Sequence, residues 1–215
     1  MNFLTKFLCM VLLGASVVAT AEPVLKTGNF IVSPKYFNGF EKIKTSGIFF
    51  SGGTVYSEGG LTVTQYQADQ GNDIWVTLGN AEGVRSWYPN GGDNGYTGIE
   101  LTSGEDFSEV SFLFSSWGSG SLQYSLLNNG MEVLGGTYSS PSGVLTRAGF
   151  SGGGFDQLLL RSGSEGSIGD ARIQALQLDS IKADSLVAAV PEPGTFALLA
   201  LGMAGMIVRR RKAST

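Results

Sequence analysis

Short runs of alternating apolar and polar residues recur through the middle of the chain. The clearest of them are Leu61–Thr64, Ile74–Leu78, Val110–Phe114 and Leu122–Leu126. A period of two is typical of β-strands with one face buried and one face in water, whereas a helix repeats every ~3.6 residues. Asn128-Asn129-Gly130 follows the last run and predicts a hairpin turn into Met131–Leu134, because Asn and Gly tolerate a positive φ.

The same pattern continues toward the C-terminus. Further strands are expected at Val144–Ala148, Phe155–Arg161 and Arg172–Ile181. The segments 154–160 and 175–181 have the pattern of two adjacent sandwich strands. The segment 151–154 predicts a turn, since neither the Lys-Ser/Thr pair nor the helix of a phosphate loop follows it.

Glycine punctuates these runs at about twice its usual share of about 7% of residues, with 32 glycines in 215 residues. About ten to twelve short strands with Gly-rich connections predict an all-β fold in which two antiparallel sheets pack as a sandwich. A jelly roll is favoured over an up-and-down barrel. The sequence contains no internal repeat of fixed period, so a solenoid is not predicted.

The N-terminus has the pattern of a secretory signal peptide. Lys6 gives a positive start, Phe7–Val18 is apolar, and Ala19-Thr20-Ala21 forms an A-x-A site that predicts cleavage between Ala21 and Glu22. The Sec translocon and signal peptidase are therefore expected partners. Cys9, the only cysteine, lies in the segment that is removed.

The mature chain would then contain neither cysteine nor histidine. These absences exclude Ser-His-Asp and Cys-His catalysis, thiol nucleophiles and the usual zinc ligands. Residues 22–190 carry nine Lys and Arg against 17 Asp and Glu, a formal net charge of −8. An acidic chain of this kind is not expected to bind nucleic acid, which needs a basic surface.

The C-terminus combines three elements in order. Pro191-Glu192-Pro193 stays extended, because each proline fixes its own φ and keeps the preceding residue out of the α region. Thr195–Val208 is apolar and short for a membrane-spanning helix, and a basic cluster follows at Arg209, Arg210, Arg211 and Lys212. By the positive-inside rule the basic end stays cytoplasmic and the body lies outside.

This order of elements resembles the PEP-CTERM sorting tail. The resemblance implies an exosortase-type processing enzyme as partner, a transmembrane sorting helix that anchors the chain transiently in the inner membrane, and a final location at the cell surface or in the extracellular matrix. An ordinary single-pass anchor is the alternative. The segment 36–41 and the late strands are also similar to jelly-roll bodies of PEP-CTERM proteins, which implies a fold more than an activity.

The expected organisation is a signal peptide at 1–21, a β-sandwich domain at 22–182, a linker of small residues at 183–189 and the sorting tail at 190–215. Within the domain, the segment 87–98 has the composition of a long loop rich in Gly, Asn and Asp. A sugar-binding platform is one interpretation of it, and a connection pinned by packed aromatic rings is the other. The candidate ligand-binding residues are Trp87, Tyr88, Asp93, Asn94 and Tyr96.

Two acidic segments have weaker patterns. Asp69, Asn72 and Asp73 could supply oxygen ligands for a structural Ca²⁺, but the EF-hand pattern is incomplete and an acidic turn between two strands is the favoured explanation. The segment 105–109, with Glu105, Asp106 and Glu109, is a candidate acid/base pair of a glycosidase or the solvated entrance of a strand. No other cofactor is expected.

Together these features predict an exported, non-enzymatic structural or exopolysaccharide-binding protein. A polysaccharide-acting enzyme that uses carboxylates alone is the rival interpretation. An ice-binding or adhesion role ranks lower, since the body has no regular Thr-x-Thr ranks.

Overall fold

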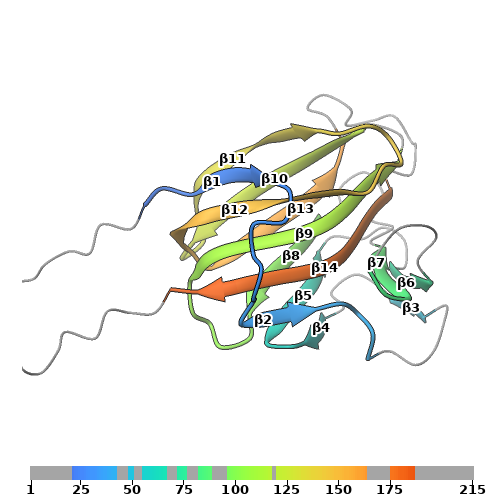
Figure 1. The fold of residues 1–215 in the computed structure, drawn as a ribbon, viewed down its shortest axis with the longest axis horizontal. Helices are drawn as coiled ribbons and strands as arrows, with labels where there is room; N and C mark the ends of the chain where they lie inside the picture. Colours follow the sequence, from blue (N-terminus) through green and yellow to red (C-terminus); the bar gives the residue numbers. More distant parts are fainter. Residues whose placement is uncertain are drawn as a thin grey trace, which may run out of the picture.

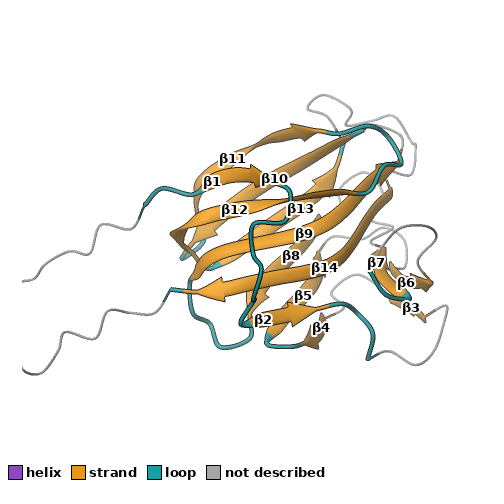
Figure 2. Ribbon diagram, in the orientation of Figure 1, coloured by secondary structure: helices purple, strands orange, loops and turns teal. Residues whose placement is uncertain are grey.

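The computed structural model describes residues 21–42, 48–50, 55–66, 72–76, 82–88, 96–117, 120–163 and 175–186. Within these ranges the chain forms strands and loops and no helix (Figures 1 and 2). No helix in the part described is long and apolar enough to cross a membrane. Residues 1–20 of the predicted signal peptide and the predicted sorting tail at 190–215 lie outside the described residues.

The strands form two antiparallel sheets. The larger sheet has the order β1-β12-β9-β14-β7-β6-β3, with β2 also pairing with β14. Its strands are β1 (Val24–Thr27), β2 (Tyr36–Asn38), β3 (Ile48–Phe50), β6 (Asn72–Val76), β7 (Arg85–Tyr88), β9 (Phe107–Trp117), β12 (Thr146–Phe155) and β14 (Ala175–Ser185).

The smaller sheet has the order β11-β10-β13-β8-β5-β4. Its strands are β4 (Val55–Glu58), β5 (Leu61–Tyr66), β8 (Tyr96–Leu101), β10 (Ser121–Asn128), β11 (Met131–Ser139) and β13 (Gln157–Ser162). From β8 onward the chain passes repeatedly from one sheet to the other, so that neighbours in sequence often lie in opposite layers.

The core lies between the two sheets. Along β5 every second residue is buried, so Leu61 and Val63 point inward while Thr62 and Thr64 point out. Aromatic rings supply most of the bulk, since the largest fully buried side chains include Phe40, Trp87, Phe107, Phe112, Phe114, Phe150 and Phe155. Burial of such rings is the main favourable term for a fold of this type.

The predicted all-β, two-sheet antiparallel sandwich is confirmed, and so is the β10–β11 hairpin. Asn129 and Gly130 form its turn with φ of 50° and 77°. The chain order and the alternation between layers are those of a jelly roll. Each predicted run with clear period-two alternation that falls in the described part lies in a strand.

Three expectations about the later strands are wrong. Residues 154–160 are not one strand, because β12 ends at Phe155 and β13 begins at Gln157. β13 and β14 are not adjacent, since they belong to opposite sheets. The 151–154 segment is not a turn but the end of β12, where the pairing with β9 shifts register between Ser151 and Phe155. β14 itself runs from Ala175 to Ser185, so the strand includes the first three residues of the segment 183–189.

Candidate functional site

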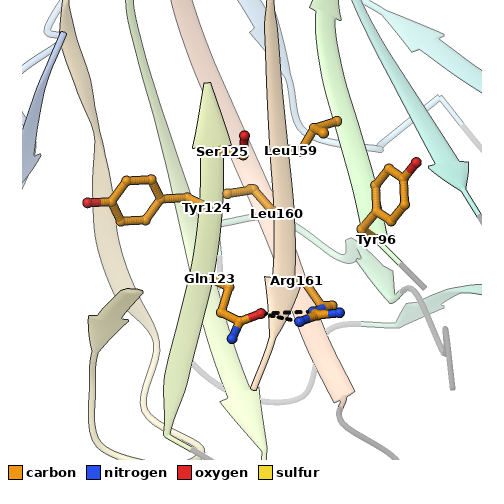
Figure 3. Close-up of a pocket in the computed structure, with 7 residues that line it drawn as sticks. All are labelled: Tyr96, Gln123, Tyr124, Ser125, Leu159, Leu160 and Arg161. Carbon is orange, nitrogen blue, oxygen red and sulfur yellow. Dashed lines mark hydrogen bonds between the residues drawn. The ribbon is translucent and has the colours of Figure 1, made fainter. Parts of the chain in front are cut away.

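The outer face of the smaller sheet carries a shallow depression of about 210 Å³ over β8, β10 and β13 (Figure 3). Strand register places its side chains. Gln123 of β10 is paired with Arg161 of β13, and Ser125 is paired with Leu159. On the other side of β13, Leu159 is paired with Gly98 of β8. Tyr124 and Leu160 also line the depression, but their positions in the alternation direct them toward the core.

Two stacked tyrosines form one end of the depression. Tyr96 begins β8 and is paired with Tyr66, the last residue of β5. Their ring centroids lie 5.1 Å apart and the ring planes differ by 22°. Because β8 lies between β5 and β13, Tyr66 braces Tyr96 on the side away from the depression. Tyr96 itself lines the depression.

Gly98 makes this tyrosine arrangement fit. A Cβ atom at residue 98 would lie 2.6 Å from a ring carbon of Tyr66, so the ring rests directly on the glycine backbone. Partial burial raises the pKa of the Tyr66 hydroxyl above its usual value, with the nearby Glu100 carboxylate adding to the effect. The phenol therefore stays neutral and acts as a hydrogen-bonding group.

Arg161 and Gln123 form the other end. The Nε of Arg161 donates to the Oε1 of Gln123 at 2.9 Å, and one terminal guanidinium nitrogen donates to the same oxygen. Figure 3 shows the amide and the guanidinium side by side, with Tyr96 beyond them on the next strand. The guanidinium plane is thus fixed by a neutral partner.

A second polar group lies further along the same face. The Nε2 of Gln157 donates to the Oε1 of Glu100 and, at 3.4 Å, to the hydroxyl of Tyr66. Glu132 of the edge strand β11 accepts a hydrogen bond from Ser125. The outer face therefore combines aromatic rings, amides, an arginine and two carboxylates that already have neutral donors.

The structure corrects the expectation for Trp87. This residue is in β7, not in a loop, and its side chain is 0% exposed. Its ring stacks on Phe40 with centroids 6.0 Å apart, and its Nε1 donates to Thr97 Oγ1 at 3.2 Å. A fully buried ring cannot stack on a sugar, so Trp87 is a core residue. Its burial follows from its place in the core between the sheets, where Phe40, Ile99 and Leu178 belong to the same buried cluster.

Only some of the other sequence-derived candidates are among the described residues. Tyr88 ends β7, and Asp93 and Asn94 lie outside the described residues. Tyr96 is the one candidate of this group that lines the depression. Asn72 and Asp73 are in β6 rather than in an acidic turn, and Asp69 lies outside the described part.

Glu105 and Glu109, two members of the candidate acid/base segment, have different contacts. Glu105 accepts hydrogen bonds from Tyr36 and Ser103, which lower the pKa of its carboxyl, and Lys35 lies 3.8 Å away. Glu109 lies within β9, and burial raises the pKa of its carboxyl. Among the described residues no group of three acidic side chains could hold a metal ion.

A buried carboxyl lies away from the depression, on the larger sheet. Asp179 of β14 is 0% exposed, and burial raises its pKa to about 7, with Glu41 and Glu82 adding to the effect. Its Oδ1 accepts the backbone N–H of Ser180 at 2.6 Å, a residue held at φ 44°. The guanidinium of Arg147 reaches this region, with one nitrogen 3.0 Å from Glu82 and another donating to the Ser180 carbonyl at 3.3 Å.

Sequence reasoning missed most of the depression. Gln123 and Arg161 come from strands far apart in the chain, as does Tyr66, which stacks on Tyr96 from outside the depression, and only the strand order brings them together. The usable signal is a polar or aromatic residue at most outward positions of an alternating strand, such as Gln123 and Arg161, although Leu159 departs from it. That signal identifies a face of the sheet, although it does not identify neighbours on that face.

Comparison with known proteins supports the tail assignment directly. Residues 189–212 match the PEP-CTERM protein-sorting motif, which includes Pro191–Pro193 and Arg209–Lys212. No curated protein sequence matches the chain.

Similar solved structures include family 29 carbohydrate-binding modules. A mutant of CBM29-2 complexed with mannohexaose is 11% identical, with a TM-score of 0.34 over 75% of this chain and 92% of that chain. Another family 29 module is 12% identical, with a TM-score of 0.33 over 75% of this chain and 89% of that chain.

Proposed function

We propose that this protein is exported, is processed at its C-terminal tail by an exosortase-type enzyme, and binds a polysaccharide at the cell surface or in the surrounding matrix. The PEP-CTERM sorting motif at residues 189–212 supports the first two steps. The outer face of the smaller sheet supports the third. Its role is non-enzymatic.

The binding proposal rests mainly on the position of the Tyr96 ring. This ring stacks on Tyr66 and lies in the same depression as the hydrogen-bonded pair Gln123 and Arg161. Sugars present an apolar face that stacks on aromatic rings and an equatorial rim of hydroxyls that need hydrogen-bonding partners. Tyr96 offers the ring, while Gln123 and Arg161 offer an amide and several N–H donors within the same depression. Because these groups are already fixed by Tyr66 and by each other, binding would order few additional side chains.

The size of the depression fits part of a chain rather than a whole small molecule. Its volume of about 210 Å³ is below the range of about 300 to 1,000 Å³ of enclosed small-molecule pockets. An open, shallow site lets a polymer enter and leave across the strands. A polysaccharide is therefore a better match than a free monosaccharide.

The residues around the depression favour binding over hydrolysis. Glycoside hydrolysis uses a pair of carboxylates about 5 to 10 Å apart across the bond that is cleaved. No carboxylate is among the described residues that line the depression. Glu100 and Glu132, the carboxylates on the same face, each accept a hydrogen bond from a neutral side chain of the protein.

A panel of neutral and acidic polysaccharides in native affinity gels tests this proposal. We expect the full chain, kept in a mild detergent, to be retarded by at least one polymer, and Tyr96→Ala to lose most of that retardation. Phe37→Ala is the matched control, because Phe37 is an aromatic residue 42% exposed on the larger sheet. Equal retardation of the wild type and Tyr96→Ala by every binding polymer would contradict the proposed site.

A further inference from the structure

The charges on the outer face of the smaller sheet are not paired with one another. Glu100 accepts from Gln157 and Glu132 accepts from Ser125, both neutral donors. Arg161 donates to the neutral amide of Gln123. The ion pairs Lys35–Glu105 and Arg147–Glu82 lie elsewhere in the fold and do not involve Arg161. Among the residues that the structure describes, the partner of the Arg161 guanidinium is thus a neutral amide and not a carboxylate.

This arrangement is unusual for an acidic protein. Residues 22–190 carry an excess of eight negative charges, so carboxylates are abundant as partners for a partly buried arginine. A partly buried guanidinium is commonly matched with a carboxylate, because its planar fork fits two oxygens at once. In the described part of the chain Arg161 instead pairs with the neutral amide of Gln123 and lines the depression.

The geometry of the guanidinium also leaves donors available. Arg161 has five N–H groups, of which the Nε–H and one terminal N–H are directed at Gln123 Oε1. The amide oxygen holds the guanidinium plane in place, and the remaining N–H groups lie at the lining of the depression that also contains Tyr96. A sugar ring stacked on Tyr96 would bring a carboxylate substituent on that ring toward the Arg161 guanidinium, which Gln123 already holds in position.

We infer that the sugar recognised at this site carries a carboxylate, as in a uronic acid residue, and that Arg161 binds this carboxylate while Gln123 holds the guanidinium in position. This inference rests on the proposed function and specifies its ligand class. Tyr96 contributes affinity for the sugar ring, and Arg161 contributes the preference for an acidic sugar over a neutral one.

Polygalacturonate and the same polymer after carboxyl reduction form the matched pair of probes, since they differ in the carboxylate alone. With the full chain in mild detergent, we expect polygalacturonate to bind about tenfold or more tightly than its reduced form, as expected for a charge-assisted bidentate contact. Raising the salt concentration should weaken the first interaction much more than the second.

Two substitutions at Arg161 distinguish the effect of its positive charge from the effect of its bidentate geometry. Arg161→Gln should abolish the preference for polygalacturonate, whereas Arg161→Lys should retain only part of it, because lysine keeps the charge without the bidentate geometry. Lys26→Gln is the control, since it removes one positive charge from the larger sheet. Thermal melting of each variant checks that the fold is intact.

The outcomes distinguish this inference from the proposed function. Equal binding of both polymers, or a preference that survives Arg161→Gln, overturns the carboxylate assignment and leaves polysaccharide binding in place. Equally tight, Arg161-dependent binding of dextran sulfate also overturns it, because the site would then recognise any anion. Failure of the wild type to bind any polymer in the panel overturns the proposed function itself.

Discussion

Individual side chains in this sandwich connect the two sheets through specific contacts. Trp87 of the larger sheet donates to Thr97 of the smaller sheet, and Thr97 in turn donates to Gln65 at 3.0 Å. All three residues are buried. Their hydrogen bonds satisfy polar groups that would otherwise destabilise the core. Trp87 therefore contributes both apolar area and a polar link between layers.

Replacement of Trp87 by alanine should destabilise the protein strongly. The change removes a fully buried ring that stacks on Phe40 and leaves Thr97 without its indole donor. We expect a loss of about 3 to 5 kcal/mol in the free energy of unfolding, measured by chemical denaturation. Phe37→Ala on the surface should cost far less. A loss near that of the surface control would contradict the core role of Trp87.

Asp179 should make stability depend on pH. Its folded pKa of about 7 lies above the ordinary value of 3.8, so the folded state holds a proton that the unfolded state has released between these values. Stability from this group is therefore full below about pH 4 and is lost as the pH rises toward 7. Asp179→Asn should remove this loss of stability at higher pH, because asparagine does not ionise.

The measurement is the difference in unfolding free energy between Asp179→Asn and the wild type at pH 5 and at pH 8. We expect the variant to gain relative to the wild type as the pH increases, because asparagine keeps an acceptor for the Ser180 N–H and carries no charge. Taking the difference between variant and wild type cancels the contributions of the other carboxyl groups to the pH dependence of stability. A constant difference across this range would show that Asp179 is ionised in the folded protein at pH 5.

At the scale of strands, period-two alternation was sufficient to locate β5, β9 and β10 and to assign their inner and outer faces. It was not sufficient to assign partners. Gln157–Leu160 and Ala175–Ile181 have similar patterns but belong to opposite sheets, because pairing depends on contacts between distant segments. Tyr96 was nominated by composition alone, whereas Arg161 and Gln123 become a site only through the β10–β13 register.

The pairing of β9 and β12 depends on a residue without a side chain at position 149. A Cβ atom on Gly149 would lie 2.0 Å from the Val110 carbonyl oxygen and 2.6 Å from the Ser111 Cα. Both contacts are with backbone, so the strands would have to separate. We expect Gly149→Ala to cost about 1 to 3 kcal/mol or more in unfolding free energy.

Ser151→Ala in the same strand is the control, since it adds no atoms. It should change the unfolding free energy by less than about 0.5 kcal/mol, as is usual for substitutions away from the core. Amide hydrogen exchange would locate the effect, with faster exchange in β9 and β12 of the Gly149 variant. Wild-type stability of Gly149→Ala would show that the two strands approach less closely than described here.

At the scale of the whole molecule, both ends of the described chain leave the sandwich on the same side (Figure 1). A Cβ on Gly152 would meet the Glu22 carbonyl oxygen at 2.4 Å, and one on Gly153 would meet Leu186 at 2.5 Å, so the two ends pack against one segment of β12. At the opposite end, Ser162 contacts Ser116, one residue beyond Arg161. Arg161 therefore lies at the end of the sandwich opposite to the two ends of the described chain.

Processing of the tail gives a prediction of its own. The PEP-CTERM motif at residues 189–212 leads us to expect a mature chain that ends near residue 190. Intact-mass analysis of protein recovered from an exosortase-containing host measures this end directly. Replacing Pro191 and Pro193 with alanine should leave the chain unprocessed. Recovery of wild-type chains that retain Arg209–Lys212 would indicate a permanent membrane anchor instead.

Hydroxyl-radical footprinting can determine whether a polysaccharide covers the outer face of the smaller sheet. In the presence of a polymer that binds, Tyr66 and Tyr96 should be protected from oxidation. Met131, which is 72% exposed at the β10–β11 hairpin, and Phe37 on the larger sheet should react as in the free protein. Protection of Phe37 with unchanged oxidation of Tyr66 and Tyr96 would contradict the account.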